Sequence, residues 1–181
     1  KIKVARGSLD EDVRRIEAAR RIVGADGVLM VDANQVLDRN EALRRGLVYQ
    51  ELGAYWFEEP LRPHDTAGYR WLCDQLTMPV ATGENHYTRY AVQELLSAGG
   101  CDILQPDARR TGGPSEWIEI AGLASAHHMP IASHGGEGVT THLLMATPTA
   151  VWCETGNIPK GPGMYTDRAR IEGGFIHAPE G

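Results

Sequence analysis

The chain has 181 residues, of which 42% are hydrophobic and 23% are charged, so it can bury one sizeable core of ordinary globular composition. Its formal net charge of -6, with lysines and arginines scattered along the chain, argues against binding to nucleic acid or to an anionic membrane surface. The sequence contains neither an apolar stretch long enough for a membrane helix nor a signal-like start, and its three cysteines are far apart, which favours a cytoplasmic protein without a disulfide or zinc framework.

The first part of the chain predicts a strand, a helix and a second strand. Residues 1–4 resemble the end of a strand. Ser8 and Glu11 are spaced as a capping box, so a helix begins there, and Gly24 can end it. The apolar run over 28–32 predicts a strand that is buried on both faces.

The same alternation continues along the rest of the chain. Asp38 predicts the N-cap of a second helix, in which Leu43, Leu47 and Leu52 would face the core. Beyond about Thr155 the sequence is rich in glycine and proline and predicts no clear element. Further strands are predicted over 55–58, 80–84, 103–107, 130–134 and 151–154, and further helices over 66–76, 88–98, 114–128 and 138–146.

This alternation of strands and helices predicts βαβ units and a parallel sheet, so the fold class is α/β. We interpret it as an incomplete TIM-type (β/α) barrel, because a full barrel typically needs about 250 residues. A doubly wound open sheet is the competing architecture, but it would place its ligand at one switch point, whereas here every strand end offers a polar group. The abrupt first and last residues lead us to expect part of a larger chain.

Six of the predicted strands end in an acidic or imidazole side chain, and each of these residues follows the previous one by 20 to 27 positions. In a barrel of parallel strands they would emerge at one rim, where barrel enzymes keep their chemistry. Any one of them could instead cap a helix or form a salt bridge. Burying several like charges together is costly unless a cation or proton compensates, so the joint pattern favours a site. The six are Asp32, Glu58, Glu84, Asp107, His134 and Glu154.

Three of these carboxylates follow consecutive strands: Asp32, Glu58 and Glu84. Mg²⁺ prefers oxygen ligands and usually keeps waters or substrate oxygens in its coordination shell. The sequence therefore predicts that these three residues bind Mg²⁺. A metal-dependent hydrolase on the same barrel would need a His-x-His pair at an early strand end, and the sequence has none.

The other members of the set suit proton transfer. Lys1 and Lys3 would face the same way on a strand, and their mutual repulsion disfavours the ammonium form, as a general base requires. Taken alone, they could equally be two solvated lysines at an exposed strand end. Asp107 and His134 could form a dyad in which the carboxylate orients the imidazole. Glu154 could stay protonated and donate a hydrogen bond to a developing oxyanion.

Seven motifs occur in chain order, and their combination is highly specific although single ones are weak. They are Lys1-x-Lys3, Val31-Asp-Ala-Asn-Gln35, Trp56-Phe-Glu-Glu-Pro60, Gly83-Glu-Asn85, Gln105-Pro-Asp107, Ser133-His134 and Trp152-Cys-Glu154. With them the chain resembles the enolase superfamily, specifically its mandelate racemase-like subgroup (the mandelate racemase/muconate lactonizing enzyme family), over nearly its whole length. The family's N-terminal capping domain and first barrel strand are absent from this sequence. We therefore expect residues 1–181 to be the catalytic barrel from the end of strand 2 through strand 8, with part of the C-terminal tail.

The resemblance implies a role for each matching residue. Lys3 matches the lysine base, and Lys1 matches the partner that approaches the substrate carboxylate. His134 matches the second base, Asp107 its orienter and Glu154 the electrophile. The matching magnesium ligands are Asp32, Glu58 and Glu84; the predicted substrate contacts are Lys1, Glu154, Asn34, which matches a polar residue of the site, and His86, which follows Glu84 by two positions.

The implied reaction is removal of the proton alpha to a carboxylate, and the superfamily is an established example of a lysine or histidine base acting with Mg²⁺ to stabilise the resulting enediolate. Loss of a β-hydroxyl would then give a dehydratase of an aldonate or aldarate sugar acid, which we favour because members with these bases and similar polar loops are mostly acid-sugar dehydratases. Reprotonation would instead give a racemase or epimerase of a 2-hydroxy acid. An inactive fragment that retains the metal site is the non-catalytic alternative. We expect a small-molecule sugar-acid substrate, no nucleic-acid or membrane partner, and a homo-oligomer.

Overall fold

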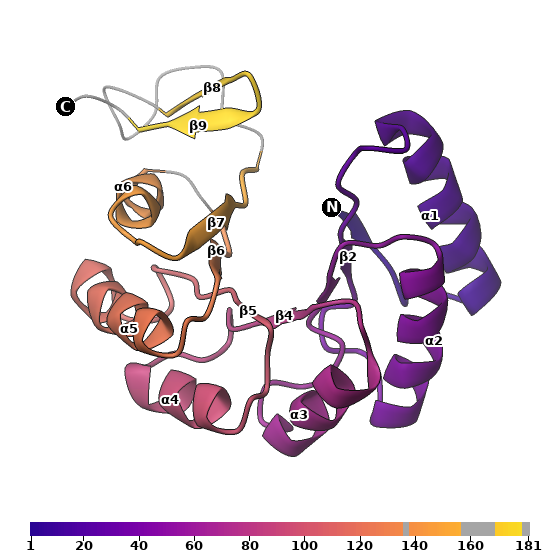
Figure 1. The fold of residues 1–181 in the computed structure, drawn as a ribbon, viewed down its shortest axis with the longest axis horizontal. Coiled ribbons are helices and arrows are strands. Elements are labelled where there is room, and N and C mark those ends of the chain that lie inside the picture. The colour runs from indigo at the N-terminus through magenta and orange to yellow at the C-terminus, as the bar shows by residue number, and fades with distance from the viewer. Residues whose placement is uncertain (136–137, 157–168, 179–181) are drawn as a thin grey trace. The chain divides into compact units, whose positions relative to one another are not determined.

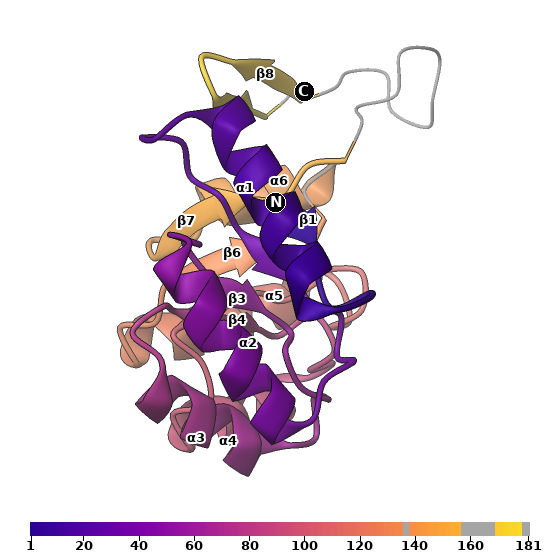
Figure 2. The same ribbon diagram turned by 90° about the vertical axis from the view of Figure 1, so that its right-hand side faces the viewer.

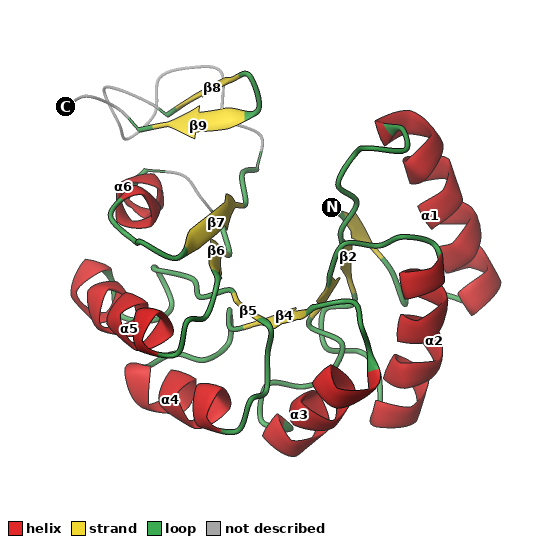
Figure 3. Ribbon diagram, viewed as in Figure 1, coloured by secondary structure: helices red, strands yellow, loops and turns green. Residues whose placement is uncertain are grey.

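Strands and helices alternate along the chain in the computed structural model, as Figures 1 and 3 show. The structure describes residues 1–135, 138–156 and 169–178. Within these residues no helix is both long enough and apolar enough to span a membrane. The strands that carry the predicted site residues pair in parallel, which confirms the α/β fold class.

The chain forms two compact units. The first unit contains Lys1–Thr82 and Glu94–Ile103, and the second contains Gly83–Gln93 and Leu104–Gly181. Each unit has its own parallel strands and helices. That the two together form one catalytic barrel portion over residues 1–181 stays a prediction.

Four parallel strands form the sheet of the first unit, in the order β1-β2-β3-β4. Lys3 is paired with Asp32, and Asp32 is paired with Glu58, so these residues occupy equivalent positions at the ends of three adjacent strands. The register therefore aligns three residues that the sequence placed at strand ends. The strands are β1 (Ile2–Lys3), β2 (Val31–Asp32), β3 (Phe57–Glu58) and β4 (Val80–Thr82).

The helices of this unit lie on the outer side of its strands, as the two views in Figures 1 and 2 show. They are α1 (Leu9–Val23), α2 (Arg39–Glu51) and α3 (Thr66–Gln75); α4 (Arg89–Ser97) crosses from the second unit into the first. Ser8 and Asp38 accept hydrogen bonds from backbone N–H groups in the first turns of α1 and α2, which confirms both predicted N-caps.

One part of the helix prediction was wrong. Leu47 of α2 is 42% exposed, whereas Leu43 and Leu52 pack against the core as expected. The buried face of α2 instead contains Arg45 and Tyr49, because a buried carboxylate on α1 provides a partner for their polar atoms. A polar side chain can therefore occupy a core-facing position when its hydrogen bonds are satisfied there.

The second unit has three parallel strands in the order β5-β6-β7, with a bulge between β6 and β7. The pairing shifts by one residue at Val151, so that Ser133 is opposite Cys153. The next residues along the two strands are His134 and Glu154, which this register brings near each other. The elements are β5 (Ile103–Leu104), α5 (Pro114–Ala126), β6 (Ile131–Ser133), α6 (Val139–Met145) and β7 (Ala150–Cys153).

A two-stranded hairpin near the C-terminus corrects the expectation of no clear element beyond about Thr155. Strands β8 (Arg170–Glu172) and β9 (Phe175–His177) pair in an antiparallel way. Gly173 and Gly174 join them with φ values of 58° and 83°, the left-handed conformation that a two-residue hairpin turn requires. The Gly-Gly pair was the signal in the sequence, and it was overlooked because the flanking strands are short.

Candidate active site

In the first unit, two buried carboxylates lie side by side with two lysines. Asp32 and Glu58 are both completely buried. The Nζ atom of Lys1 is 2.5 Å from Oε1 of Glu58 and 3.5 Å from Oδ2 of Asp32, while Lys3 donates to the same Asp32 oxygen. Each lysine is therefore paired with a carboxylate at the strand ends.

The remaining oxygens of these carboxylates also accept hydrogen bonds. The indole Nε1 of Trp56 is 3.2 Å from Oε2 of Glu58, because residues two apart on a strand face the same side. The backbone N–H of Asn34 donates to Oδ1 of Asp32 at 2.9 Å. The predicted contact residue Asn34 thus positions a carboxylate through its backbone, while its side chain accepts a hydrogen bond from Arg6.

Burial and charge act in opposite directions on the two carboxyl groups. Burial, the largest influence, raises the pKa of Glu58, the Lys1 ammonium lowers it and the nearby Asp32 charge raises it, so that the pKa of Glu58 is about 8. Burial also raises the pKa of Asp32, but the hydrogen bond from Lys3 and the charge of Lys1 outweigh it, so that its pKa lies below the ordinary value. The two carboxylates therefore need compensating positive charge, and a hard divalent cation with oxygen ligands fits such a donor pair.

Within the part of the chain that the structure describes, no three His, Cys, Asp or Glu side chains are arranged to hold a metal ion. In the first unit, all four oxygens of Asp32 and Glu58 accept hydrogen bonds or ion pairs, two of them from lysine ammonium groups. The third predicted ligand, Glu84, belongs to the second unit. The three-carboxylate magnesium site stays a prediction.

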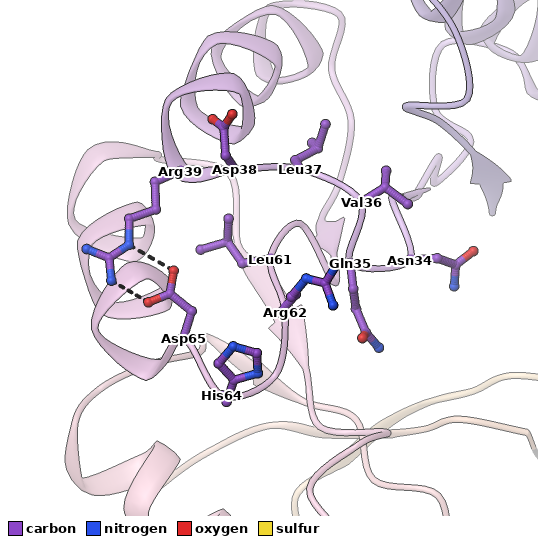
Figure 4. Close-up of a pocket in the computed structure, with 10 residues that line it drawn as sticks. All are labelled: Asn34, Gln35, Val36, Leu37, Asp38, Arg39, Leu61, Arg62, His64 and Asp65. Atoms are coloured by element: carbon purple, nitrogen blue, oxygen red, sulfur yellow. Dashed lines mark hydrogen bonds and ion pairs between the residues drawn. The ribbon is translucent and has the colours of Figure 1, made fainter.

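A pocket in the first unit opens beside the loops that follow β2 and β3 (Figure 4). It has a volume of about 940 Å³ and contains Arg62 and His64, neither of which the sequence had indicated. Figure 4 shows the ion pair of Arg39 with Asp65 on one side and Gln35 on the other. The pocket gives the loops near Asp32 and Glu58 a polar surface.

The second unit assembles the other predicted residues around one imidazole. Nδ1 of His134 is 2.7 Å from Oδ2 of Asp107, while Nε2 is 3.2 Å from Oε2 of Glu84 and 4.0 Å from Oε2 of Glu154. Since the Asp107 carboxylate can only accept, the Nδ1–H of His134 donates to it. The structure thus brings together the predicted base and its orienter, with Nε2 directed toward the other two carboxylates.

Two arginines that sequence reasoning missed hold this cluster. Arg109 donates from Nε and from its terminal nitrogen to the two oxygens of Asp107, at 3.1 and 2.8 Å, and Arg110 is 3.0 Å from Glu84. Burial raises the pKa of Asp107, but the hydrogen bonds from Arg109 and His134 outweigh it and lower the pKa to about 2. Asp107 is therefore ionised at neutral pH. The signal in the sequence was a pair of arginines that follows a strand-end carboxylate after one intervening alanine.

The last predicted residues of this unit lie in its loops. Oε2 of Glu154 accepts a hydrogen bond of 2.9 Å from the backbone N–H of Gly135. A pocket of about 300 Å³ is lined by His134 and Glu154 together with Arg109 and Gly135. His86, predicted as a substrate contact, is only 6% exposed.

Gly83, directly before Glu84, has φ +144°, and a Cβ there would lie 2.8 Å from the backbone N of Gln105. We expect Gly83→Ala to destabilise the protein by about 1–3 kcal/mol, because an added methyl must displace backbone. Denaturant unfolding of the intact protein measures this loss. Gly122→Ala in α5 is the matched control, since a Cβ there meets nothing within 4 Å. Equal stability of the two variants would contradict the expectation.

Parallel strands joined by helices, with acidic and imidazole side chains at the strand ends, define an α/β protein with a polar site at the carboxyl ends of its strands. The chain belongs to the Enolase C-terminal domain-like family, whose model matches residues 1–181. This confirms the resemblance that the sequence motifs indicated.

Individual relatives agree with this assignment. The chain is 38% identical to L-talarate/galactarate dehydratase of Salmonella typhimurium, covering 85% of this chain and 39% of the relative. It is 32% identical to 3,6-anhydro-alpha-L-galactonate cycloisomerase of Streptomyces coelicolor, covering 99% of this chain and 50% of the relative. The solved structure of L-talarate dehydratase from Polaromonas sp. JS666, complexed with Mg and L-glucarate, superimposes with a TM-score of 0.88 at 31% identity, covering 97% of this chain and 48% of that one. The chain thus spans half or less of the length of each.

Proposed function

We propose that the intact protein is a magnesium-dependent enzyme that removes the proton alpha to the carboxylate of a sugar acid and then expels the β-hydroxyl as water. The observation that carries this proposal is the pairing of His134 with ionised Asp107, with Nε2 of the imidazole directed toward Glu84 and Glu154. The dehydratases among the relatives support the substrate class, an aldonate or aldarate.

Asp32 and Glu58 would hold the magnesium ion, with Glu84 as the third predicted ligand. When bound, Mg²⁺ supplies Lewis-acid stabilisation of the substrate carboxylate. Lys1 lies against both first-unit carboxylates and would contact the substrate carboxylate beside them. Its ammonium would compensate the negative charge that develops when the alpha proton leaves.

Lys3 would accept the alpha proton, so that the C–H electron pair forms the enediolate. His134 would then protonate the β-hydroxyl. The enediolate electrons would form the Cα–Cβ double bond while the C–O electron pair leaves with water, and the resulting enol would tautomerise to a 2-keto-3-deoxy acid. Asp107 keeps the imidazole oriented through Nδ1, and Glu154 would donate a hydrogen bond to the developing oxyanion. His86 and Asn34 would line the substrate site.

Racemisation or epimerisation of a 2-hydroxy acid is the second candidate, because the same two bases could remove and return a proton on opposite faces. The observation that favours it is the position of His134 Nε2, which would serve reprotonation of carbon as well as of oxygen. A homo-oligomeric assembly and a cytoplasmic location stay predictions of the sequence.

Solvent deuterium tests the reaction class. We expect the intact protein, incubated with magnesium and a set of aldonates and aldarates in D₂O, to introduce deuterium at a carbon derived from the substrate alpha or beta position. Mass spectrometry or NMR would detect it, and 2-keto-3-deoxy products would identify dehydration, whereas deuterium at C2 of the epimeric sugar acid would identify epimerisation. If substrates turn over without any exchange of the alpha proton, enolisation is wrong.

A further inference from the structure

Asp12, in the first turn of α1, is a buried charge that the proposed chemistry does not use. It is 1% exposed, although the first turn of a surface helix normally presents acidic residues to solvent. The sequence pattern had indicated nothing special about this position.

Three hydrogen-bond donors converge on its carboxylate. The backbone N–H of Ala5 lies 3.0 Å from each of the two oxygens. Arg45 and Tyr49, both on α2, donate to Oδ2 at 2.5 Å. Arg45 also donates to the carbonyl oxygen of Gly7 at 3.0 Å, so the loop after β1 is held at two points. Asp12 therefore connects the loop after β1 to α2.

That loop begins directly behind the proposed base. Ala5 follows Lys3 by two residues and has φ +60°, a conformation that an alanine adopts only when its surroundings hold it there. Strand β1 has only two residues, and beyond it Val4 N–H still bonds to Asp32 O at 2.9 Å. The next backbone N–H, that of Ala5, donates to Asp12. The Asp12 side chain therefore holds the backbone in place just beyond the end of the sheet.

A second connection reaches the proposed metal ligand. The ring of Tyr49 packs edge-to-face against Phe57, with centroids 5.3 Å apart and an interplanar angle of 83°. Phe57 is completely buried and directly precedes Glu58. Through Tyr49, Asp12 is thus joined to the strand that carries the partner of Lys1.

We propose that Asp12 is a positioning residue, which holds the backbone behind Lys3 so that this side chain keeps its direction beside Asp32. The inference rests on the proposed function, in which Lys3 removes the alpha proton. A residue that only joined α1 to α2 would affect folding stability and would not distinguish one face of the substrate from the other.

The test compares proton removal from the two C2 epimers of an accepted sugar acid, one presenting its alpha proton to Lys3 and the other to His134. The variants are Asp12→Asn and the milder Tyr49→Phe, which removes a single hydroxyl bonded to Asp12. The intact protein is incubated with magnesium and each epimer in D₂O, and NMR measures the rate at which the alpha-proton signal disappears. This rate includes both dehydration of the substrate and exchange of its alpha proton for deuterium.

We expect Asp12→Asn to slow the Lys3-facing epimer on the order of 10²-fold, the effect of a misplacement of about 1 Å, and Tyr49→Phe to slow it less. The His134-facing epimer should react at the wild-type rate in both. Tyr69→Phe is the matched control: Tyr69 is equally buried in the same unit and its hydroxyl donates to Leu61 O at 2.6 Å. It should lower stability without a preference for either epimer.

Two results with a folded Tyr49→Phe variant would overturn the inference, even if Asp12→Asn fails to fold. One is the wild-type rate on each epimer, and the other is the same fold-decrease in rate on both epimers. A wild-type protein that removes the alpha proton from neither epimer would overturn the proposed function and this inference with it. A fall confined to the Lys3-facing epimer supports both.

Discussion

Replacing Lys3 with methionine should stop removal of the alpha proton from one face of the substrate and leave the other face to His134. His134→Asn should have the converse effect. The expected loss on the affected face is about 10²–10⁴-fold, the range typical of a general acid or base. The measurement is the rate of alpha-proton loss from each C2 epimer, together with magnesium affinity, which should remain near normal in both variants.

The physical reason is that each base has its own surroundings. Lys3 lies at the end of β1 against Asp32, whereas His134 follows β6 and donates to Asp107. Loss of one side chain leaves the contacts of the other in place. His127→Asn is the control for the second base, because this exposed histidine follows α5 in the same unit. If both Lys3→Met and His134→Asn process both epimers at the wild-type rate, the assignment of two bases is wrong.

The second large effect is expected at Glu58. In the wild-type protein, added Mg²⁺ should raise the melting temperature, because a ligand that binds only the folded state stabilises it by mass action. Glu58→Gln removes one of two completely buried carboxylates and should abolish most of this rise. We expect kcat/KM to fall by about 10²–10³-fold, as when one charge-stabilising group is lost from an active site.

Glu59→Gln is the matched control for this experiment. Glu59 is adjacent in the chain, is 1% exposed and accepts a hydrogen bond of 2.7 Å from Gln35 Nε2. The same substitution there should lower stability but retain the magnesium-dependent rise in melting temperature. Thermal melts with and without magnesium measure both variants. A Glu58→Gln protein that magnesium stabilises as strongly as the wild type would remove Glu58 from the proposed metal site.

The parts of the fold that could be predicted depend on local patterns. Ser8 and Asp38 were recognisable as N-caps because capping needs only a side chain and the next turn of the same helix. Strand ends were recognisable because each apolar run stops at a polar residue. The pairing of Asp107 with His134 followed from the same reasoning, since the ends of neighbouring parallel strands lie together.

Contacts between segments that are distant in the sequence could not be predicted. Leu47 was expected in the core, but Arg45 and Tyr49 face it because Asp12, on another helix, satisfies their polar atoms. Arg110 was overlooked because an arginine after a strand is usually solvated, and only the folded chain brings it to 3.0 Å from Glu84, which is 26 residues away in the sequence. No local periodicity contains either contact.

The family, the α/β class and the identity of the strand-end residues were thus readable from the sequence, because they follow from hydrophobic period and from motifs whose spacing matches one strand and one helix. The partners of those residues were decided by the folded chain. Strand register aligned Lys3 with Asp32 and Asp32 with Glu58. The bulge at Val151 placed Ser133 opposite Cys153, so that the next residues, His134 and Glu154, lie near each other. Strand pairing and burial set the direction and charge of a side chain, and both depend on segments that are distant in the sequence.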